Sequence, residues 1–212
     1  LPGFTKAAVA LYEEFILESV RMEVDSLLVS KQGSCIPLIE KIPAAVIGKI
    51  LGLPICDLQK FSRWSMIGGL MLAGEVQAEK LEYMASQTEE MTSYLTDQFD
   101  RSFDQACSQE HAIINVLCKA FKKGELSKQE AIGTLIILFG AGGESTSALI
   151  GSAIFYFSNF PELQKELREN KNLISVYFEE VARLQPPFKF HYRSVISNCS
   201  LGGYEIFADE KL

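Results

Sequence analysis

A carboxylate and two hydroxyls follow a pair of glycines in the middle of a long apolar stretch. They belong to the hexapeptide Ala-Gly-Gly-Glu-Ser-Thr at residues 141–146, and Glu144 is the one charged residue between positions 131 and 157. A glycine inside a helix costs about 1 kcal/mol relative to alanine, so a pair indicates a place where the backbone bends or another group approaches closely. A carboxyl and a hydroxyl in apolar surroundings can pass protons by general acid–base chemistry. The candidate catalytic residues are therefore Glu144, Ser145 and Thr146.

A possible ion pair comes later in the chain. Glu180 and Arg183 stand three positions apart, so they share one face of a helix. Such a pair usually lies on the protein surface and then contributes only about 0.3–0.5 kcal/mol. The pair by itself therefore predicts no particular function.

Two further sets of oxygen-bearing side chains have the spacing of metal ligands. One set falls at i, i+3 and i+7 on one helix face, and the other has the spacing Asn-x-x-Ser-x-x-x-Glu. The sets are Asp97, Asp100 and Asp104, and Asn172, Ser175 and Glu179. Oxygen ligands suit Mg²⁺ that bridges a diphosphate, and the second spacing is similar to that of class I terpene synthases. A solvated helix face explains the first set more simply, so a magnesium site stays an alternative.

The residues around Glu144 depend on one long helix. Ser127 and Glu130 form a Ser-x-x-Glu capping box, and Asn159-Phe160-Pro161 is a strong stop, so the pattern predicts a helix over 128–158. The stretch is long enough to cross a bilayer. A glutamate, two glycines and several hydroxyls in its middle favour the alternative, a core helix that neighbouring helices surround. We therefore expect no membrane span.

Helical periodicity recurs through most of the remaining chain. It predicts further helices over 5–30, 44–51, 57–64, 76–101, 112–121, 161–170 and 173–184. After the stop at Pro186-Pro187, apolar and polar residues alternate around Gly202-Gly203, which predicts a β-hairpin within 188–212. We expect one mainly helical, all-α domain over 1–212 with a short β-hairpin near its C-terminus.

Composition narrows the classes of function. The 212 residues are 48% apolar and 22% charged, which is enough for one sizeable core. A net charge of −7 and a pI of about 5.0, without a basic stripe, argue against a nucleic-acid partner. The five cysteines are isolated and show no CxxC spacing, so we expect reduced thiols, a cytoplasmic protein and no cysteine-based metal site.

Four motifs together resemble the cytochrome P450 superfamily, particularly its soluble bacterial type. The family's long central helix carries Ala/Gly-Gly-x-Asp/Glu-Thr-Thr/Ser, matched here by residues 141–146. Its later Glu-x-x-Arg is matched by residues 180–183, and its Pro-Pro segment leading to an arginine by residues 186–187 and Arg193. Residues 47–54 look like its Ile-x-x-Leu-Leu-Gly-Val-Pro stretch. The motifs occur in the family's order and cover nearly the whole chain.

The resemblance implies a role for each matched residue. Glu144 and Ser145 would be the acid–alcohol pair that relays protons during oxygen activation, with a serine where the family usually has threonine. Gly142, together with Ala141, would border the haem in a widened part of the helix. The remaining roles are a structural core pair for Glu180 and Arg183, a haem-propionate contact for Arg193, and the edge of the substrate pocket for Phe188 and Phe190.

The resemblance also implies an activity. Members act as haem-thiolate monooxygenases, here on a small hydrophobic or natural-product-like molecule of secondary metabolism, with electrons from a ferredoxin or flavoprotein. The family's iron ligand is a cysteine in a Phe-x-x-Gly-x-x-x-Cys-like loop well beyond the position of Arg193, and this sequence contains no such loop. Cys199 lies in the predicted hairpin instead. We therefore do not expect this chain alone to bind haem through a thiolate or to work as an oxygenase.

Two accounts of the missing loop stay open at the level of sequence. In the first, these residues are the central portion of a longer P450-type monooxygenase. In the second, the protein is a shortened, haem-free relative with a non-oxidative role. That role would be either a magnesium-dependent, terpene-synthase-like cyclisation, with Asp97, Asp100, Asn172, Ser175 and Glu179 as ligands, or that of an auxiliary partner of a biosynthetic enzyme.

Overall fold

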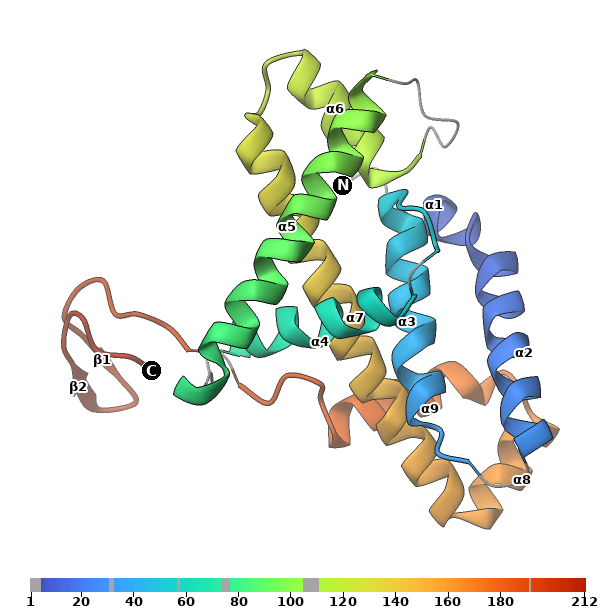
Figure 1. The fold of residues 1–212 in the computed structure, drawn as a ribbon. Helices are drawn as coiled ribbons and strands as arrows, with labels where there is room; N and C mark the ends of the chain where they lie inside the picture. Colours follow the sequence, from blue (N-terminus) through green and yellow to red (C-terminus); the bar gives the residue numbers. More distant parts are fainter. Residues whose placement is uncertain (1–4, 31–32, 57, 74–76, 105–110, 191) are drawn as a thin grey trace.

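The computed structural model describes residues 5–30, 33–56, 58–73, 77–104, 111–190 and 192–212. Helices dominate these ranges, and a small antiparallel sheet follows them near the C-terminus (Figure 1). The predicted all-α fold with a late β-hairpin is confirmed. The elements in chain order are α1 (Lys6–Ala10), α2 (Glu13–Ser30), α3 (Ile36–Leu51), α4 (Leu58–Ala73), the 3-10 turn η2 (Ala78–Lys80), α5 (Leu81–Asp104), α6 (Ile113–Lys122), α7 (Lys128–Asn159), α8 (Pro161–Glu169), α9 (Leu173–Leu184), β1 (Cys199–Leu201) and β2 (Tyr204–Ile206).

The long helix α7 crosses the centre of the fold. Its start is the predicted capping box: the backbone N–H of Glu130 donates to Ser127 Oγ at 3.2 Å, and the N–H of Ser127 donates to Glu130 Oε2 at 2.7 Å. Helices α3, α4, α5, α6, α8 and α9 all pack against α7. By length and composition α7 is the one described helix that could cross a membrane. The core helix of a soluble protein passes the same test, so length and composition alone do not distinguish the two.

The largest buried side chains gather where α3, α4, α5 and α6 meet α7. The ring of Phe61 on α4 lies edge-on to the ring of Phe139 on α7, with their centroids 5.3 Å apart. Trp64 and Phe99 are buried in the same cluster. These contacts lock α4 against α7, so the position of α4 along α7 is set by aromatic packing.

Several helices differ from the predicted ranges. The segment predicted as one helix over 5–30 is divided, because α1 ends at Ala10 and α2 begins at Glu13. Helix α3 begins at Ile36, eight residues earlier than predicted; it has one proline in its first turn, where proline is tolerated, and it continues through Pro43. Helix α4 continues through Gly68-Gly69 to Ala73, nine residues beyond the predicted end at 64. The predicted starts at 57 and 76 lie outside the described residues.

The β-hairpin has the predicted turn. Cys199 pairs with Ile206 and Leu201 with Tyr204, and the connecting Gly202 and Gly203 have φ values of 60° and 86°. Glycine adopts this left-handed backbone without steric cost, which makes Gly-Gly a good two-residue hairpin connection. Figure 1 shows the hairpin extending away from the helices.

Candidate active site on the central helix

The backbones of α4 and α7 nearly touch at two glycines. A Cβ atom added to Gly68 would lie 2.5 Å from the Cα of Gly140, and one added to Gly140 would lie 2.9 Å from the Cα of Gly68. Both distances are shorter than any ordinary contact between carbon atoms. The candidate residues 141–146 therefore begin directly at this crossing.

The two glycines of the motif face neighbouring helices. A Cβ at Gly142 would lie 2.8 Å from Ile47 Cδ1 on α3, and a Cβ at Gly143 would overlap the side chain of Ser65 on α4. Helix α7 continues without interruption through both positions. In this structure the two glycines thus allow α3 and α4 to approach α7 closely. Ile47 and Ser65 fill the faces of α7 where the resemblance implied a widened helix.

Glu144 extends its carboxyl over Gly69 of α4. Its side chain is half-buried, and burial raises the pKa of the carboxyl because the charged form is poorly solvated there. Within the described ranges this carboxyl makes no ion pair or hydrogen bond. The two cations of α4 are engaged elsewhere: Lys60 and Arg63 contact Glu90 on α5 at 3.1 and 3.5 Å. Glu144 is thus a carboxyl whose proton is held more strongly than that of an exposed glutamate.

The hydroxyl of Ser145 is bonded within the helix. Ser145 Oγ donates to the carbonyl oxygen of Ala141 at 2.6 Å, and the buried Ser147 makes the same bond to Gly143 at 2.9 Å. Successive helix residues point about 100° apart, so Ser145 lies on the face next to that of Glu144. Thr146 is exposed. The structure thus places Glu144 against α4 and Ser145 on the adjacent face of α7, with the third candidate turned toward solvent.

The two predicted magnesium-ligand sets do not come together. Asp100 Oδ1 pairs at 2.7 Å with Lys128 at the start of α7. Ser175 and Glu179 lie on α9, which contacts α7 near its other end. There the Tyr177 hydroxyl donates to the carbonyl of Ala153. Those two points on α7 are about 37 Å apart, at 1.5 Å per residue. In the ranges that the structure covers, no group of three or more His, Cys, Asp or Glu side chains is arranged to hold a metal ion.

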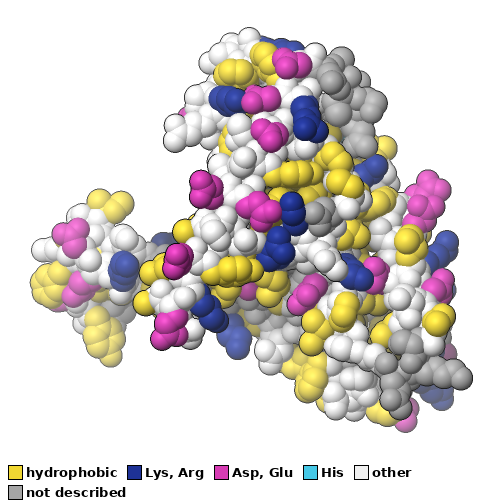
Figure 2. Space-filling model, viewed as in Figure 1, with side chains coloured by type: hydrophobic (Ala, Val, Ile, Leu, Met, Phe, Trp, Pro, Cys, Tyr) yellow, Lys and Arg dark blue, Asp and Glu magenta, His cyan; other side chains and the backbone are white. Residues whose placement is uncertain are grey.

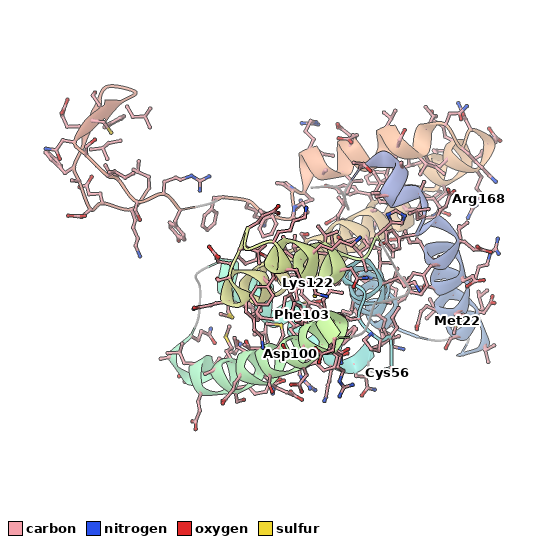
Figure 3. The ribbon with its side chains drawn as sticks, turned by 90° about the horizontal axis from the view of Figure 1, so that it is seen from above. Met22, Cys56, Asp100, Phe103, Lys122 and Arg168 are labelled. Carbon is pink, nitrogen blue, oxygen red and sulfur yellow. The ribbon has the colours of Figure 1, made fainter. Side chains whose placement is uncertain are left out.

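Viewed from above, the α5–α6 contact and helix α8 are well separated. Asp100, Phe103 and Lys122 lie close together at the α5–α6 end, and Arg168 on α8 lies far across the molecule (Figure 3). Lys122 Nζ donates to the carbonyl of Phe103 at 3.0 Å, which ties α6 to α5 there. Asp97, Asp100 and Asp104 are all exposed on α5, and Asp100 pairs with Lys128.

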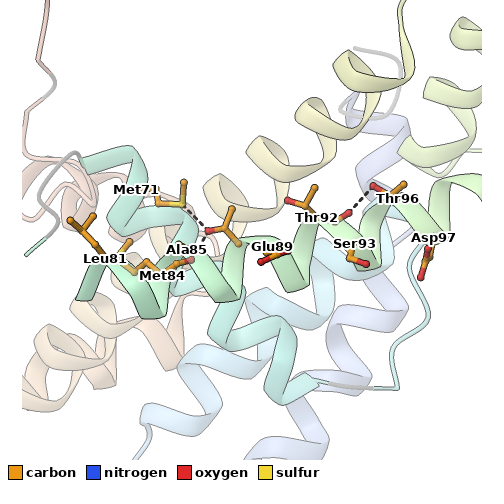
Figure 4. A pocket seen from close by; sticks show the side chains of 10 residues that line it. Met71, Leu81, Met84, Ala85, Glu89, Thr92, Ser93, Thr96 and Asp97 are labelled. Atoms are coloured by element: carbon orange, nitrogen blue, oxygen red, sulfur yellow. Dashed lines mark hydrogen bonds between the residues drawn. The ribbon is translucent and has the colours of Figure 1, made fainter. Parts of the chain in front are cut away.

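A long open groove runs along α5. It has a volume of about 860 Å³ and is lined by Met71 of α4 and by one face of α5, from Leu81 to Asp97 (Figure 4). Two threonine hydroxyls in its lining are bonded within α5: Thr88 Oγ1 donates to the carbonyl of Met84 at 2.8 Å, and Thr96 Oγ1 donates to the carbonyl of Thr92 at 2.8 Å. None of the candidate residues 141–146 lines this groove.

Comparison with known proteins decides the family. The family model described as Cytochrome P450 matches residues 71–212, two thirds of this chain. The chain belongs to the cytochrome P450 family. It is 32% identical over 209 residues to cytochrome P450 144 of Mycobacterium tuberculosis, which covers 96% of this chain and 46% of the relative. It is 31% identical over 147 residues to the mycinamicin IV hydroxylase/epoxidase of Micromonospora griseorubida, covering 69% of this chain and 35% of the relative.

Solved P450 structures superpose on nearly the whole chain. CYP109E1 from Bacillus megaterium, in complex with testosterone, shares 27% identity with a TM-score of 0.84, over 99% of this chain and 55% of that one. P450BioI, bound to an acyl carrier protein carrying hexadec-9Z-enoic acid, has a TM-score of 0.88 at 24% identity, over 99% of this chain and 54% of that one. This P450 chain thus spans about half the length of the relatives that it matches.

The Glu-x-x-Arg pair of this P450 is formed but exposed. Arg183 Nε donates to Glu180 Oε2 at 2.7 Å and Arg183 Nη2 donates to Glu180 Oε1 at 2.6 Å. The hydrogen bonds from Arg183 hold the pKa of the Glu180 carboxyl below its usual range. The side chains are 53% and 66% exposed, so the pair does not lie inside the core as the resemblance implied. Glu180 lines an open groove that α9 forms with α8 and the end of α7.

The remaining predicted site residues lie on the segment after α9. Phe188 and Phe190 are 39% and 60% exposed, and the ring of Phe190 contacts that of Tyr192. Arg193 is exposed, and its Nη1 donates to the carbonyl of Tyr192 at 2.9 Å. Figure 1 shows this segment leading away from the helices toward the hairpin. Their roles at a propionate and in a substrate pocket stay predictions.

P450 family members bind haem, and the described cysteines do not fit its thiolate ligation at α7. Cys118 is buried at the α5–α6 contact, where its Sγ lies 3.7 Å from the carbonyl of Phe99. Cys56 lies beside Pro54 in the turn after α3, and Cys199 is exposed on β1. Cys35 precedes α3, and the fifth cysteine, Cys107, lies outside the described residues. The contacts of Cys118 and Cys56 are with Phe99 and Pro54, outside residues 141–146.

Sequence reasoning missed the part of the site that α4 contributes. Ser65, Gly68 and Gly69 form the surface on which the Glu144 segment rests. A signal was present, since small residues at i, i+3 and i+4 on α4 match the small residues Gly140 and Gly143 on α7. Their pairing could not be inferred without the tertiary structure, because sequence spacing does not say which helix faces which.

Proposed function

We propose that this chain forms the central part of a P450-type haem-thiolate monooxygenase, with Glu144 and Ser145 handling protons. The observation that carries the proposal is a half-buried carboxyl of raised pKa beside a helix-bonded hydroxyl, within a family motif. The substrate would be a hydrophobic, natural-product-like molecule, which the named substrates of the mycinamicin hydroxylase/epoxidase and the testosterone complex of CYP109E1 support. The protein would be cytoplasmic and would receive electrons from a ferredoxin or flavoprotein.

The residues of this chain would supply the proton chemistry. A carboxyl with a raised pKa keeps its proton at a pH where an exposed glutamate has lost it, so Glu144 can act as a proton donor nearer neutrality. Ser145 donates a hydrogen bond to the Ala141 carbonyl and has two lone pairs that can accept a hydrogen bond from a proton donor. Each group would thus hold or pass a proton at its own position on α7.

The test uses the complete reading frame that contains residues 1–212. Glu144→Gln and Ser145→Ala remove relay groups without opening a large cavity, so haem content and melting temperature should stay near those of the unmodified protein. Substrate turnover should fall by about 10²–10⁴-fold, or reducing equivalents should be diverted to peroxide.

Thr134→Ala is the matched control. Thr134 lies on the same helix and its hydroxyl donates to the carbonyl of Glu130 at 2.8 Å, the same local bond that Ser145 makes. This control should leave turnover and peroxide formation unchanged. Normal turnover in Glu144→Gln, or an equal loss in Thr134→Ala, would contradict the proposal.

A further inference from the structure

Helix α4 presents Gly69 directly to the carboxyl of Glu144. A Cβ atom at position 69 would overlap Glu144 Oε2 and Cδ and would lie 2.9 Å from Glu144 Cβ. The side chain of Glu144 therefore occupies the space that any residue other than glycine would need. This contact is a side-chain contact, unlike the backbone contact of the adjacent Gly68 with Gly140.

The face of α4 that carries Gly69 is closed to water. Ser65 lies four residues before Gly69, so the two share one face of α4, and Ser65 is only 3% exposed. Its Oγ is buried without a hydrogen-bond partner among the described residues, at the position where it fills the space beside Gly143. A carboxyl placed against this face is therefore partly withdrawn from solvent, which agrees with the burial of Glu144.

We propose that Gly69 is a positioning residue that holds the Glu144 carboxyl in the seam between α4 and α7. The inference rests on the proposed role of Glu144 as a proton donor and adds the residue that sets its position. A side chain at position 69 turns the carboxyl out of the seam toward water, and the helix crossing itself stays in place because Gly68 and Gly140 make it. The carboxyl is the flexible end of a long side chain, so it yields before the backbone does.

The first measurement is the titration of Glu144 in the 212-residue chain. NMR of the ¹³C-labelled glutamate carboxyls gives the individual pKa values, and Glu144→Gln identifies the signal. Gly69→Ala should lower the pKa of Glu144 toward the ordinary glutamate value, because the carboxyl becomes solvated. Gly133→Ala, on α7 with no atom within 4 Å of the added Cβ, should leave that pKa unchanged. An unchanged pKa in Gly69→Ala would overturn the inference.

A double-mutant cycle separates this contact from general packing. Glu144→Ala removes the two carboxyl-end atoms that a Cβ at position 69 would overlap. Any loss of melting temperature in Gly69→Ala should therefore shrink in the Glu144→Ala background. The loss in Gly68→Ala should not shrink, because that Cβ meets the backbone of Gly140. The cycle tests the contact even if Gly69→Ala alone folds poorly. A loss of melting temperature that is equally large in the Glu144→Ala background would contradict the contact.

Activity of the complete reading frame distinguishes this inference from the proposed function. With both correct, Gly69→Ala lowers turnover, on the order of 100-fold for a misplaced group, and Gly133→Ala does not. If Glu144→Gln turns over normally, the proposed function fails whatever Gly69→Ala does. If Glu144→Gln is slow while Gly69→Ala is normal in turnover and in the titration of Glu144, the positioning role of Gly69 fails and the function stands.

Discussion

Three glutamates of this chain differ in acidity because different groups contact them. Burial against α4 raises the pKa of Glu144. Hydrogen bonds from Arg183 lower the pKa of Glu180, and the backbone N–H of Ser127 lowers that of Glu130 at the start of α7. The last two carboxylates are stabilised in their charged form, as suits an ion pair and a helix cap. Glu144 is the one of the three suited to keep a proton.

Arg183→Ala should raise the pKa of Glu180 toward its ordinary value. A depressed folded-state pKa stabilises the protein above the unfolded-state pKa, and that stabilisation is lost as the pH falls through the folded-state value. The melting temperature at pH 7 should fall only slightly, because the pair is exposed, and the difference should vanish in acid. Arg168→Ala on α8, where the arginine contacts Gln164 and the ring of Phe157, is the control. A large loss of stability in Arg183→Ala would show that the pair is buried in solution.

At the level of elements, the crossing of α4 and α7 depends on glycines that belong to two different helices. Each costs about 1 kcal/mol in helix propensity. The close approach that they permit brings Phe61 and Trp64 of α4 onto Phe139 of α7, with ring centroids 5.3 and 6.2 Å apart. Burial of these rings offsets the cost of the glycines. The seam that holds Glu144 is thus a consequence of core packing.

Gly140→Ala should destabilise the chain, because the new Cβ would lie 2.9 Å from the Cα of Gly68 and backbone cannot move aside easily. Overpacking of this kind costs about 1–3 kcal/mol, which lowers the melting temperature by about 2–4 °C for each kcal/mol in a domain of this size. Gly133→Ala on the same helix should be neutral or stabilising, by up to about 1 kcal/mol. Equal thermal unfolding curves for the two variants would contradict the close crossing.

At the scale of the whole molecule, this P450 chain leaves apolar surface uncovered. Figure 2 shows hydrophobic side chains exposed between charged ones over the face of Figure 1. On α9, Val176 and Leu184 are 61% and 46% exposed, beside the exposed Glu-x-x-Arg pair. Val176 and Leu184 line a groove of about 550 Å³ that α9 forms with α8 and the end of α7. The chain matches about half the length of its relatives.

Haem should not acquire a thiolate ligand from the 212-residue chain. Of the described cysteines, Cys118 is buried between α5 and α6, and Cys199 is exposed on β1, away from α7. Reduced protein mixed with haem and carbon monoxide should therefore lack the long-wavelength absorption band that is characteristic of the family. Imidazole-ligated haem in the same buffer is the spectroscopic control. The band's appearance, and its loss in Cys199→Ala, would show that the hairpin supplies the ligand.

The sequence by itself determined the features that depend on neighbouring residues. The capping box of Ser127 and Glu130, the end of α9 before Pro186 and the Gly202-Gly203 turn are local signals, and the structure has all three. The resemblance to the family was equally readable, because it rests on motifs of a few residues each in a fixed order. Local hydrogen bonding and backbone preference are encoded within a few positions of the residues that they affect.

Tertiary structure alone decided which faces meet. It extended α4 through Gly68-Gly69, because packing on Gly140 outweighs the poor helix propensity of glycine. It also placed the Glu144 carboxyl in that seam and left Glu180 exposed. The pKa and the exposure of a side chain depend on atoms that are distant in the chain. The spacing of residues within one helix does not specify which other element will cover that side chain.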